Sequence, residues 1–235
     1  MKRVLHGVDL DIEMSAAVSL IGGNGSGKST LLRCLVRLIE PTSGSVHLYG
    51  QDVGSLRGRA LGRLRSRVGF VFQRHNLVPR LAALTNVVHG VQARRHGPRT
   101  WLQTFAASDD RDEAYSCLEA VGLGDQALQR VDSLSGGQSQ RVAIARMLMQ
   151  RPDIILADEP DASLDPRTGR EVMELLNELT RSRGIPIVIV SHRMEHARRY
   201  SDRIVGLSGG RIVLDTPARQ SDPEALASFF EEAQQ

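Results

Sequence analysis

Residues 22–30 carry the side chains and glycines that phosphate binding requires. The stretch GGNGSGKST fits the pattern G-x-x-x-x-G-K-[ST], whose glycines let the backbone curl and point several N–H groups at one anion. Lys28 supplies a positive charge for the outer phosphates, and the hydroxyl of Ser29 can ligate Mg²⁺. A flexible turn before a lysine is the alternative. We assign phosphate binding to Gly22, Gly23, Asn24, Gly25, Ser26, Gly27, Lys28, Ser29 and Thr30.

The flanks of this loop favour phosphate binding over a flexible turn. The apolar run 17–21 predicts a short buried strand, and apolar residues at helical spacing follow over 31–39. A helix that starts at the loop adds its positive dipole end to the same anion. Strand, loop and helix therefore occur in the order that this chemistry needs.

A second apolar run, 154–157, ends in two carboxylates, Asp158 and Glu159. At the tip of a buried strand, Asp158 can hold Mg²⁺ beside Ser29, and Glu159 can act as general base toward an attacking water. An acidic turn after a core strand is the alternative. Because the phosphate loop lies upstream, we predict that both carboxylates belong to its site.

Two further polar residues follow predicted strands. Gln73 comes after the run 68–72 and could contact Mg²⁺ or the water through its amide, and His192 follows the run 185–190. Taken alone, a glutamine at a strand end is usually just exposed, and a histidine there is more often structural. Their assignment to the site depends on the whole set of motifs.

The segment 134–138 predicts a second anion site. It opens a helix expected over about 138–149, and a helix start offers free N–H groups and a positive dipole end. The γ-phosphate of one ATP needs one phosphate loop and one helix start of this second kind. We therefore expect a head-to-tail homodimer, in which each ATP lies between the phosphate loop of one copy and the segment 135–138 of the other. We assign the second site to Ser135, Gly136, Gly137 and Gln138.

The overall composition is that of an ordinary globular chain. The 235 residues include 30 Lys and Arg against 27 Asp and Glu, and aromatic residues make up 4%. With so few side chains to stack on bases, the arginines predict a solvated surface, and we expect no nucleic acid partner. No apolar run reaches the roughly 18 residues that span a bilayer, so a membrane role must come through a partner. Cys34 and Cys117 lack metal-ligand spacing and are expected to be buried, reduced thiols.

Strand and helix patterns alternate along the chain, which predicts an α/β fold with a mainly parallel sheet covered on both faces. The expected strands are 8–12, 17–21, 45–49, 68–72, 153–157, 185–190, 203–207 and 211–214. The last two form a hairpin, and the first two form a hairpin-like opening. From about 77 to 150 helical patterns replace strand patterns. We therefore expect one domain, 1–235, whose nucleotide-binding core (1–76 and 151–235) carries a helical subdomain (77–150).

Further helices are expected at 57–67 and at 81–91. Ser108 and Asp109 can cap the helix that stops at Gly122, and 97–110 reads as a loop or short helical excursion. Pro166 starts a long helix that stops at Gly184, and a last helix opens at 222–223.

Taken in order, these motifs resemble those of the ATP-binding cassette (ABC) ATPases over nearly the whole chain, and 135–138 is specific to that superfamily. The resemblance implies a P-loop NTPase core with a mainly parallel sheet, an antiparallel β portion and an inserted helical subdomain. It implies ATP and Mg²⁺ as cofactors, bound in part by Lys28, Ser29 and Thr30.

The resemblance also implies individual roles. Asp158 holds the metal through water, Glu159 is the catalytic base and His192 contacts the γ-phosphate. Gln73 links the site to the transport partner and contributes to the metal site, and Asp165 lies at the dimer seam.

Within the superfamily, the segments 71–81, 84–87 and 156–166, with Trp101 and 200–205, look like the ATPase subunits of phosphonate importers. Such a subunit would sit peripherally on the cytoplasmic face of the cell (inner) membrane. Its partners would be a second copy of itself, two transmembrane permease subunits and, indirectly, a periplasmic solute-binding protein. Related cassettes for phosphite, methionine or lipoprotein release share parts of these segments and remain alternatives.

Some positions depart from the family pattern. An aromatic residue that stacks on adenine in the family would fall just before residue 1, which suggests a start codon assigned too late or weaker adenine binding. Met14 and Ser15 replace the usual Gly-Glu turn, and Ser139 stands where Gln is common.

Two functions other than transport are less compatible with the sequence. Soluble cassette proteins of DNA repair or translation carry a long coiled-coil insertion or a second cassette, whereas only about 60 residues separate Gln73 from Leu134 here. A catalytically inactive regulatory subunit would not require Lys28, Glu159 and His192 to be intact.

Overall fold

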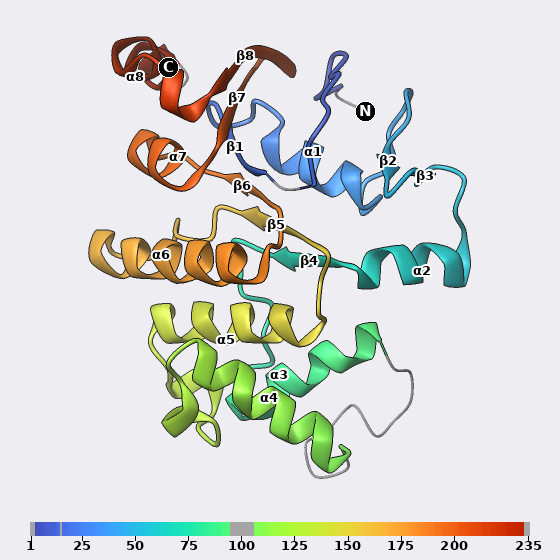
Figure 1. Ribbon diagram of the computed structural model, residues 1–235, viewed down its shortest axis with the longest axis vertical. Helices are drawn as coiled ribbons and strands as arrows, with labels where there is room; N and C mark the ends of the chain where they lie inside the picture. The colour runs from blue at the N-terminus through green and yellow to red at the C-terminus, as the bar shows by residue number, and fades with distance from the viewer. Residues whose placement is uncertain (1–2, 15, 95–105, 233–235) are drawn as a thin grey trace.

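The computed structural model describes residues 3–14, 16–94 and 106–232. A six-stranded sheet runs from the middle of the molecule to its top in Figure 1, in the order β4-β5-β6-β1-β7-β8. The first five strands are parallel and β8 is antiparallel to β7. Their bounds are Ala17–Ile21 (β1), Val68–Val71 (β4), Ile154–Asp158 (β5), Ile187–Val190 (β6), Arg203–Ser208 (β7) and Arg211–Pro217 (β8).

Alternate residues of the central strands face two different cores. Ile155 and Ala157 pack with α5 (Gly136–Met149) and α6 (Pro166–Arg183), whereas Ile154 and Leu156 pack with α1 (Lys28–Leu35). Helices α7 (Met194–Tyr200) and α8 (Pro223–Glu232) cover the β7 end of the sheet. Burial on both faces explains why these strands read as nearly continuous apolar runs. The predicted α/β architecture with a mainly parallel sheet is confirmed.

Three helices gather below the sheet in Figure 1: α3 (Ala83–Val88), α4 (Ser108–Ala120) and α5. Their shared core is continuous with the one under β5, because α5 packs on both. Helix α2 (Gly58–Ser66) and the pair β2 (His47–Leu48) and β3 (Gln51–Asp52) lie to the right of the sheet in Figure 1. Short 3₁₀ turns cover His89–Ala93, Gly124–Gln126, Val131–Ser133 and Ala218–Gln220.

The prediction of a strand at 8–12 is wrong, and so is the prediction that it forms a hairpin-like opening with the strand at 17–21. The segment alternates half-buried Val8, Leu10 and Ile12 with exposed aspartates, yet it joins no ladder. Its apolar side chains pack against the α1 core instead. The edges of β1 are already taken by β6 and β7, so the N-terminal segment has no free edge of β1 to pair with.

Other local differences are smaller. Ser108 and Asp109 are not caps but the first two residues of α4, whose N-cap is Ala107. Strand β3 and helix α7 were not predicted. Trp101 and most of 97–110 lie outside the described residues. Cys34 and Cys117 are both buried free thiols, as expected.

None of the helices in the described ranges combines the length and the apolar character that a bilayer crossing needs.

Candidate nucleotide-binding and catalytic site

The phosphate loop is shaped by a close approach that only glycine permits. Strand β1 delivers the chain to Gly22, where a Cβ would lie 2.1 Å from the carbonyl oxygen of Leu207 and where φ is +148°. Gly27, with φ of +108°, caps α1, which begins at Lys28. The free N–H groups at the start of α1 therefore border the loop, as anion binding requires.

Lys28 is buried within the loop that carries it. Its Nζ donates to the carbonyl oxygens of Gly22 at 2.7 Å and Gly23 at 2.8 Å. Burial lowers the pKa of Lys28, while the nearby charges of Glu159 and Asp158 oppose that shift. The ammonium is thus held at the loop by carbonyl groups and faces two carboxylates.

The carboxylate of Asp158, at the tip of β5, contacts two side chains of α1. Ser29 Oγ donates to Oδ1 at 2.6 Å, and Arg33 Nη2 donates to Oδ2 at 3.2 Å. The sequence reasoning missed Arg33, although its four-residue spacing from Ser29 places both on one helix face. Hydroxyl and carboxylate oxygens side by side fit the hard-ligand preference of Mg²⁺.

Glu159 and His192 meet across the ends of two neighbouring strands. Glu159 Oε1 lies 2.5 Å from His192 Nε2, and Glu159 adopts a φ of +52°, which non-glycine residues rarely occupy. The hydrogen bond from His192 lowers the pKa of Glu159, burial opposes this, and the charges of His192 and Lys28 add to the lowering. Glu159 is therefore kept ionised, the form that a general base needs.

A cavity of about 540 Å³ lies over the phosphate loop, and Asp158 and His192 are not among the described residues that line it. Asn24, Gly25, Gly27, Lys28, Ser29, Thr30 and Glu159 line it, together with Arg3, Val4, His6, Gly209 and Gly210. The last five were not predicted as site residues, because their segments are remote in sequence. Only the fold shows that the β7–β8 turn closes on the loop, where Gly210 N donates to the Ser26 carbonyl at 3.2 Å.

Gln73 is exposed two residues beyond the end of β4. Strand β4 is the neighbour of β5, so Gln73 lies at the same edge of the sheet as Asp158. It is not among the described residues that line the cavity.

The segment 135–138 forms the start of α5 and not part of this cavity. Ser135 Oγ accepts from Gln138 N at 3.2 Å, and the Gln138 side chain accepts from Ser135 N at 2.9 Å, a capping box. A Cβ on Gly137 would lie 2.3 Å from Thr168 Cγ2, so this turn packs against the start of α6. Asp165 caps α6 by accepting from the N–H groups of Arg167 and Thr168, both at 3.1 Å.

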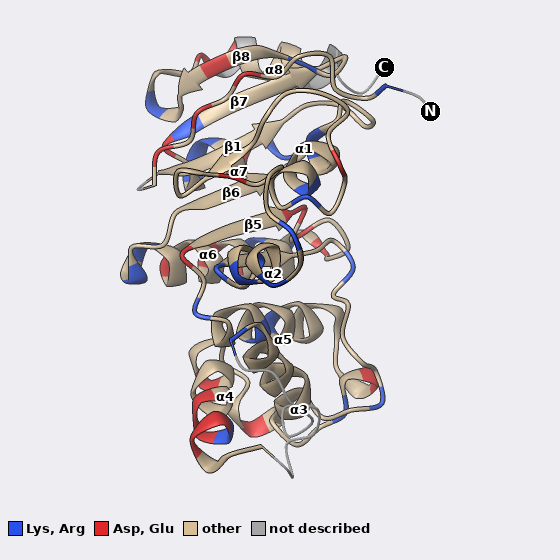
Figure 2. Ribbon diagram, turned by 90° about the vertical axis from the view of Figure 1, so that its right-hand side faces the viewer, with Lys and Arg blue, Asp and Glu red and all other residues tan. Residues whose placement is uncertain are grey.

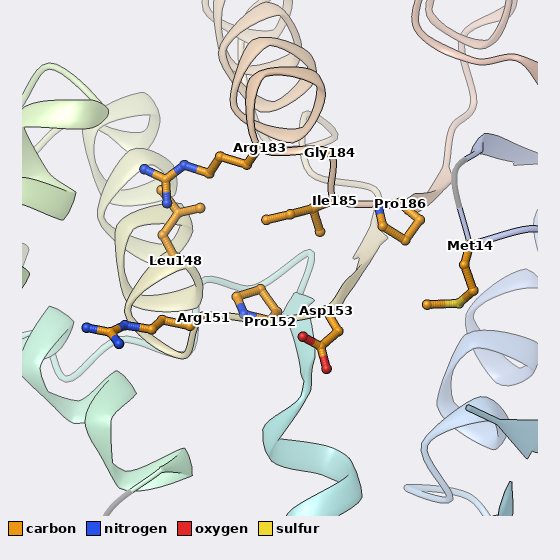
Figure 3. Close-up of a pocket in the computed structure, with 9 residues that line it drawn as sticks. All are labelled: Met14, Leu148, Arg151, Pro152, Asp153, Arg183, Gly184, Ile185 and Pro186. Carbon is orange, nitrogen blue, oxygen red and sulfur yellow. The ribbon is translucent and has the colours of Figure 1, made fainter. Parts of the chain in front are cut away.

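Another cavity, of about 410 Å³, lies at the opposite edge of the sheet (Figure 3). Its charged side chains are Arg151, Asp153 and Arg183. Arg151 binds Glu113 at 2.7 Å and Asp153 binds Arg67 at 2.5 Å, so these two charges are already compensated. None of the predicted catalytic residues lines this cavity.

Comparison with known families agrees with the site geometry. The sequence profile described as "ABC transporter" matches residues 5–162, more than half of the chain. The chain belongs to the ABC transporter family. The match runs from the N-terminal segment through the phosphate loop and the α5 start to the turn after Glu159.

Individual relatives span nearly the same length. The chain is 47% identical to the "Phosphonates import ATP-binding protein PhnC" of Bordetella parapertussis, covering 97% of this chain and 91% of that protein. It is 42% identical to "PhnC 2" of Oceanobacillus iheyensis, covering 97% and 89%. Among solved structures, the dimeric post-hydrolysis state of the ATP-binding cassette MJ0796 bound to ADP and Pi superimposes with a TM-score of 0.81, at 37% identity and 93% and 92% coverage.

Proposed function

We propose that this chain is the ATP-hydrolysing subunit that powers an importer of phosphonates. One observation supports ATP hydrolysis most directly. The Glu159–His192 contact and the Ser29–Asp158 contact are both formed next to the phosphate loop. The names of relatives that are 42–47% identical over most of the chain support the solute.

In the proposed reaction, Lys28 and the N–H groups at the start of α1 bind the phosphates of ATP. Glu159 accepts a proton from the attacking water, and His192, bonded to Glu159, contacts the γ-phosphate. Ser29, Asp158 through water and Gln73 would hold Mg²⁺, which neutralises charge on the transferred phosphoryl group when bound. Catalysis then rests on positioning and charge stabilisation.

The complete site is proposed to need a second copy of the chain. Residues 135–138 carry a capped helix start and do not line the cavity of their own copy. In a head-to-tail dimer they would meet the γ-phosphate bound by the other copy, with Asp165 at the seam. The dimeric state of MJ0796 supports this arrangement.

A groove of about 380 Å³ between α2 and the helices below the sheet is the proposed contact for the permease. Its walls include Phe70 and Phe72, whose rings stack at 4.2 Å, and half-exposed Leu38. Gln73 follows Phe72 directly, which connects the groove to the site. Figure 2 shows arginines on α2 and acidic residues on α4. Through such a contact the chain would lie peripherally on the cytoplasmic face of the inner membrane.

We also propose a division of the chain into two functional parts. Residues 77–150 act as a helical subdomain that carries the α5 start, and the core of 1–76 and 151–235 binds the nucleotide.

Reconstitution tests the solute. The chain is placed in proteoliposomes with its permease and solute-binding protein, and ATP hydrolysis is measured with and without methylphosphonate. A methylphosphonate-dependent rise is expected. Stimulation by methionine and not by methylphosphonate would contradict phosphonate import while leaving the ATPase assignment intact.

A further inference from the structure

A largely buried cluster of titratable side chains lies next to Glu159 and His192 along the chain. Asp161 is 5% exposed and His196 is 1% exposed. Asp161 Oδ2 lies 3.1 Å from His196 Nδ1 and 3.5 Å from Arg193 Nε. None of these three residues lines the cavity over the phosphate loop.

This cluster joins the same two segments that carry the catalytic pair. Asp161 belongs to the turn that begins at Glu159, since Ala162 N donates to the Glu159 carbonyl and Leu164 N to the Asp161 carbonyl, both at 3.2 Å. Arg193 directly follows His192, and the helix that contains His196 starts one residue later. Each segment is therefore linked to the other at two points, the half-buried Glu159–His192 contact and the buried contact of Asp161 with His196.

The segment around His192 is held by further hydrogen bonds. Ser191 Oγ accepts from Arg193 N at 3.1 Å, and Ser191 N donates to the Leu20 carbonyl of β1 at 3.1 Å. A small displacement of Arg193 would therefore move His192 with it. Helix α6 leaves room for the cluster at Gly169, where a Cβ would lie 3.4 Å from Asp161 Cβ.

Stability alone does not account for burying these groups. A buried ionic contact rarely stabilises a fold more than apolar side chains of the same volume would, because desolvation offsets the attraction. The two ring nitrogens of His196 lack an aligned hydrogen-bond partner among the described residues. His196 is therefore held by its contact with Asp161 and by packing. Such a cluster does, however, fix one relative position of the two segments.

We propose that Asp161 is a positioning residue, which holds His192 against Glu159 through Arg193 and His196. The inference rests on the proposed roles of Glu159 and His192 in hydrolysis. Asp161 does not line the cavity over the phosphate loop. Replacing its carboxylate should therefore slow the chemical step and leave ATP binding unchanged.

The test compares Asp161→Asn and Arg193→Gln with the wild-type chain in steady-state ATP hydrolysis. Asp161→Asn should lower kcat about tenfold and Arg193→Gln about threefold, each with KM for ATP changed by less than about twofold. Arg193 is partly exposed, so its variant decides the outcome if Asp161→Asn fails to fold. Glu174→Gln is the matched control, because Glu174 binds Arg199 of α7 at 2.9 Å without joining the Glu159 turn, and its kcat should stay at the wild-type value.

A double-mutant cycle separates positioning from general destabilisation. In a His192→Ala background, Asp161→Asn should cause no further loss of the residual rate, because its effect acts through His192. Wild-type kcat in both single variants, or an equal loss by Asp161→Asn with and without His192, would overturn the inference. If His192→Ala and Glu159→Gln themselves left hydrolysis unchanged, the proposed function and not only this inference would fail.

Discussion

Glu159 and Ser29 have the clearest proposed chemical roles among single residues. Glu159 sits at a rare backbone conformation with its carboxylate against His192, and Ser29 touches Asp158. Both were predictable because strand ends and a phosphate loop mark their positions locally. Arg33 and His6 were not, since their contacts to the site depend on which remote segments the fold brings together.

If Glu159 is the general base, as proposed, Glu159→Gln should reduce ATP hydrolysis by about 10²–10⁴ and should leave ATP affinity unchanged. The amide retains the size of the side chain but cannot accept the proton of the water. Phosphate release and equilibrium binding of ATP, measured on the same preparation, check the two parts. Wild-type turnover would remove Glu159 from the mechanism.

Ser29→Ala should shift the Mg²⁺ dependence of hydrolysis to higher concentration. The variant removes one oxygen beside Asp158, and fewer oxygen ligands weaken the affinity for a hard cation. A Mg²⁺ titration of the ATPase rate measures the shift, with Ser55→Ala, at an exposed site far along the chain, as the control. An unchanged midpoint would contradict a metal role for Ser29.

At the scale of elements, buried apolar runs predicted the central strands well, because both faces of a parallel sheet exclude water. Pairing was less predictable. The segment 8–12 has strand-like alternation but no ladder partner, and β3 has only two polar residues, Gln51 and Asp52. The α5 start was predicted as an anion site, and its capping box adds a structural role for Ser135.

Ser135 should therefore show two separable functions. Ser135→Ala removes the cap of α5 and should lower the free energy of unfolding by about 0.5–2 kcal/mol. Ser135→Asp keeps a good cap, so its unfolding free energy should stay close to wild type, yet its charge would repel a γ-phosphate and abolish hydrolysis. Denaturant unfolding and ATPase assays on both variants test this. Full activity in Ser135→Asp would argue against a phosphate contact.

The attachment of α4 should depend on pH through Glu113. Burial raises the pKa of Glu113, but hydrogen bonds from Arg151 and Arg94 outweigh it, so the pKa lies below its ordinary value of 4.5. A lowered folded-state pKa means that the stabilisation is present above the ordinary value and is lost as pH falls below it. Glu113→Gln should thus lower Tm at pH 7, and the difference should shrink as the pH falls below the ordinary value of 4.5. A pH-independent difference would assign the effect to packing.

At the scale of the whole molecule, one chain holds a phosphate cavity and a capped helix start that do not share a cavity. Sequence motifs predicted both sites, and their order predicted the family, since each motif is short and local. The spatial separation of the two sites within one chain, and the proximity of 136–137 to the start of α6, could only be seen in the fold. Together they favour a site shared between two copies.

ATP-dependent pairing of the chain tests this composite site most directly. Glu159→Gln, which should bind ATP without hydrolysing it, is examined by sedimentation velocity with and without Mg²⁺-ATP, and the double variant Ser135→Asp/Glu159→Gln is the control. We predict a species of twice the 25.8 kDa chain mass only with ATP, and only when Ser135 is intact. A Glu159→Gln chain that binds ATP yet stays monomeric at all protein concentrations, or a dimer unaffected by Ser135→Asp, would contradict the account.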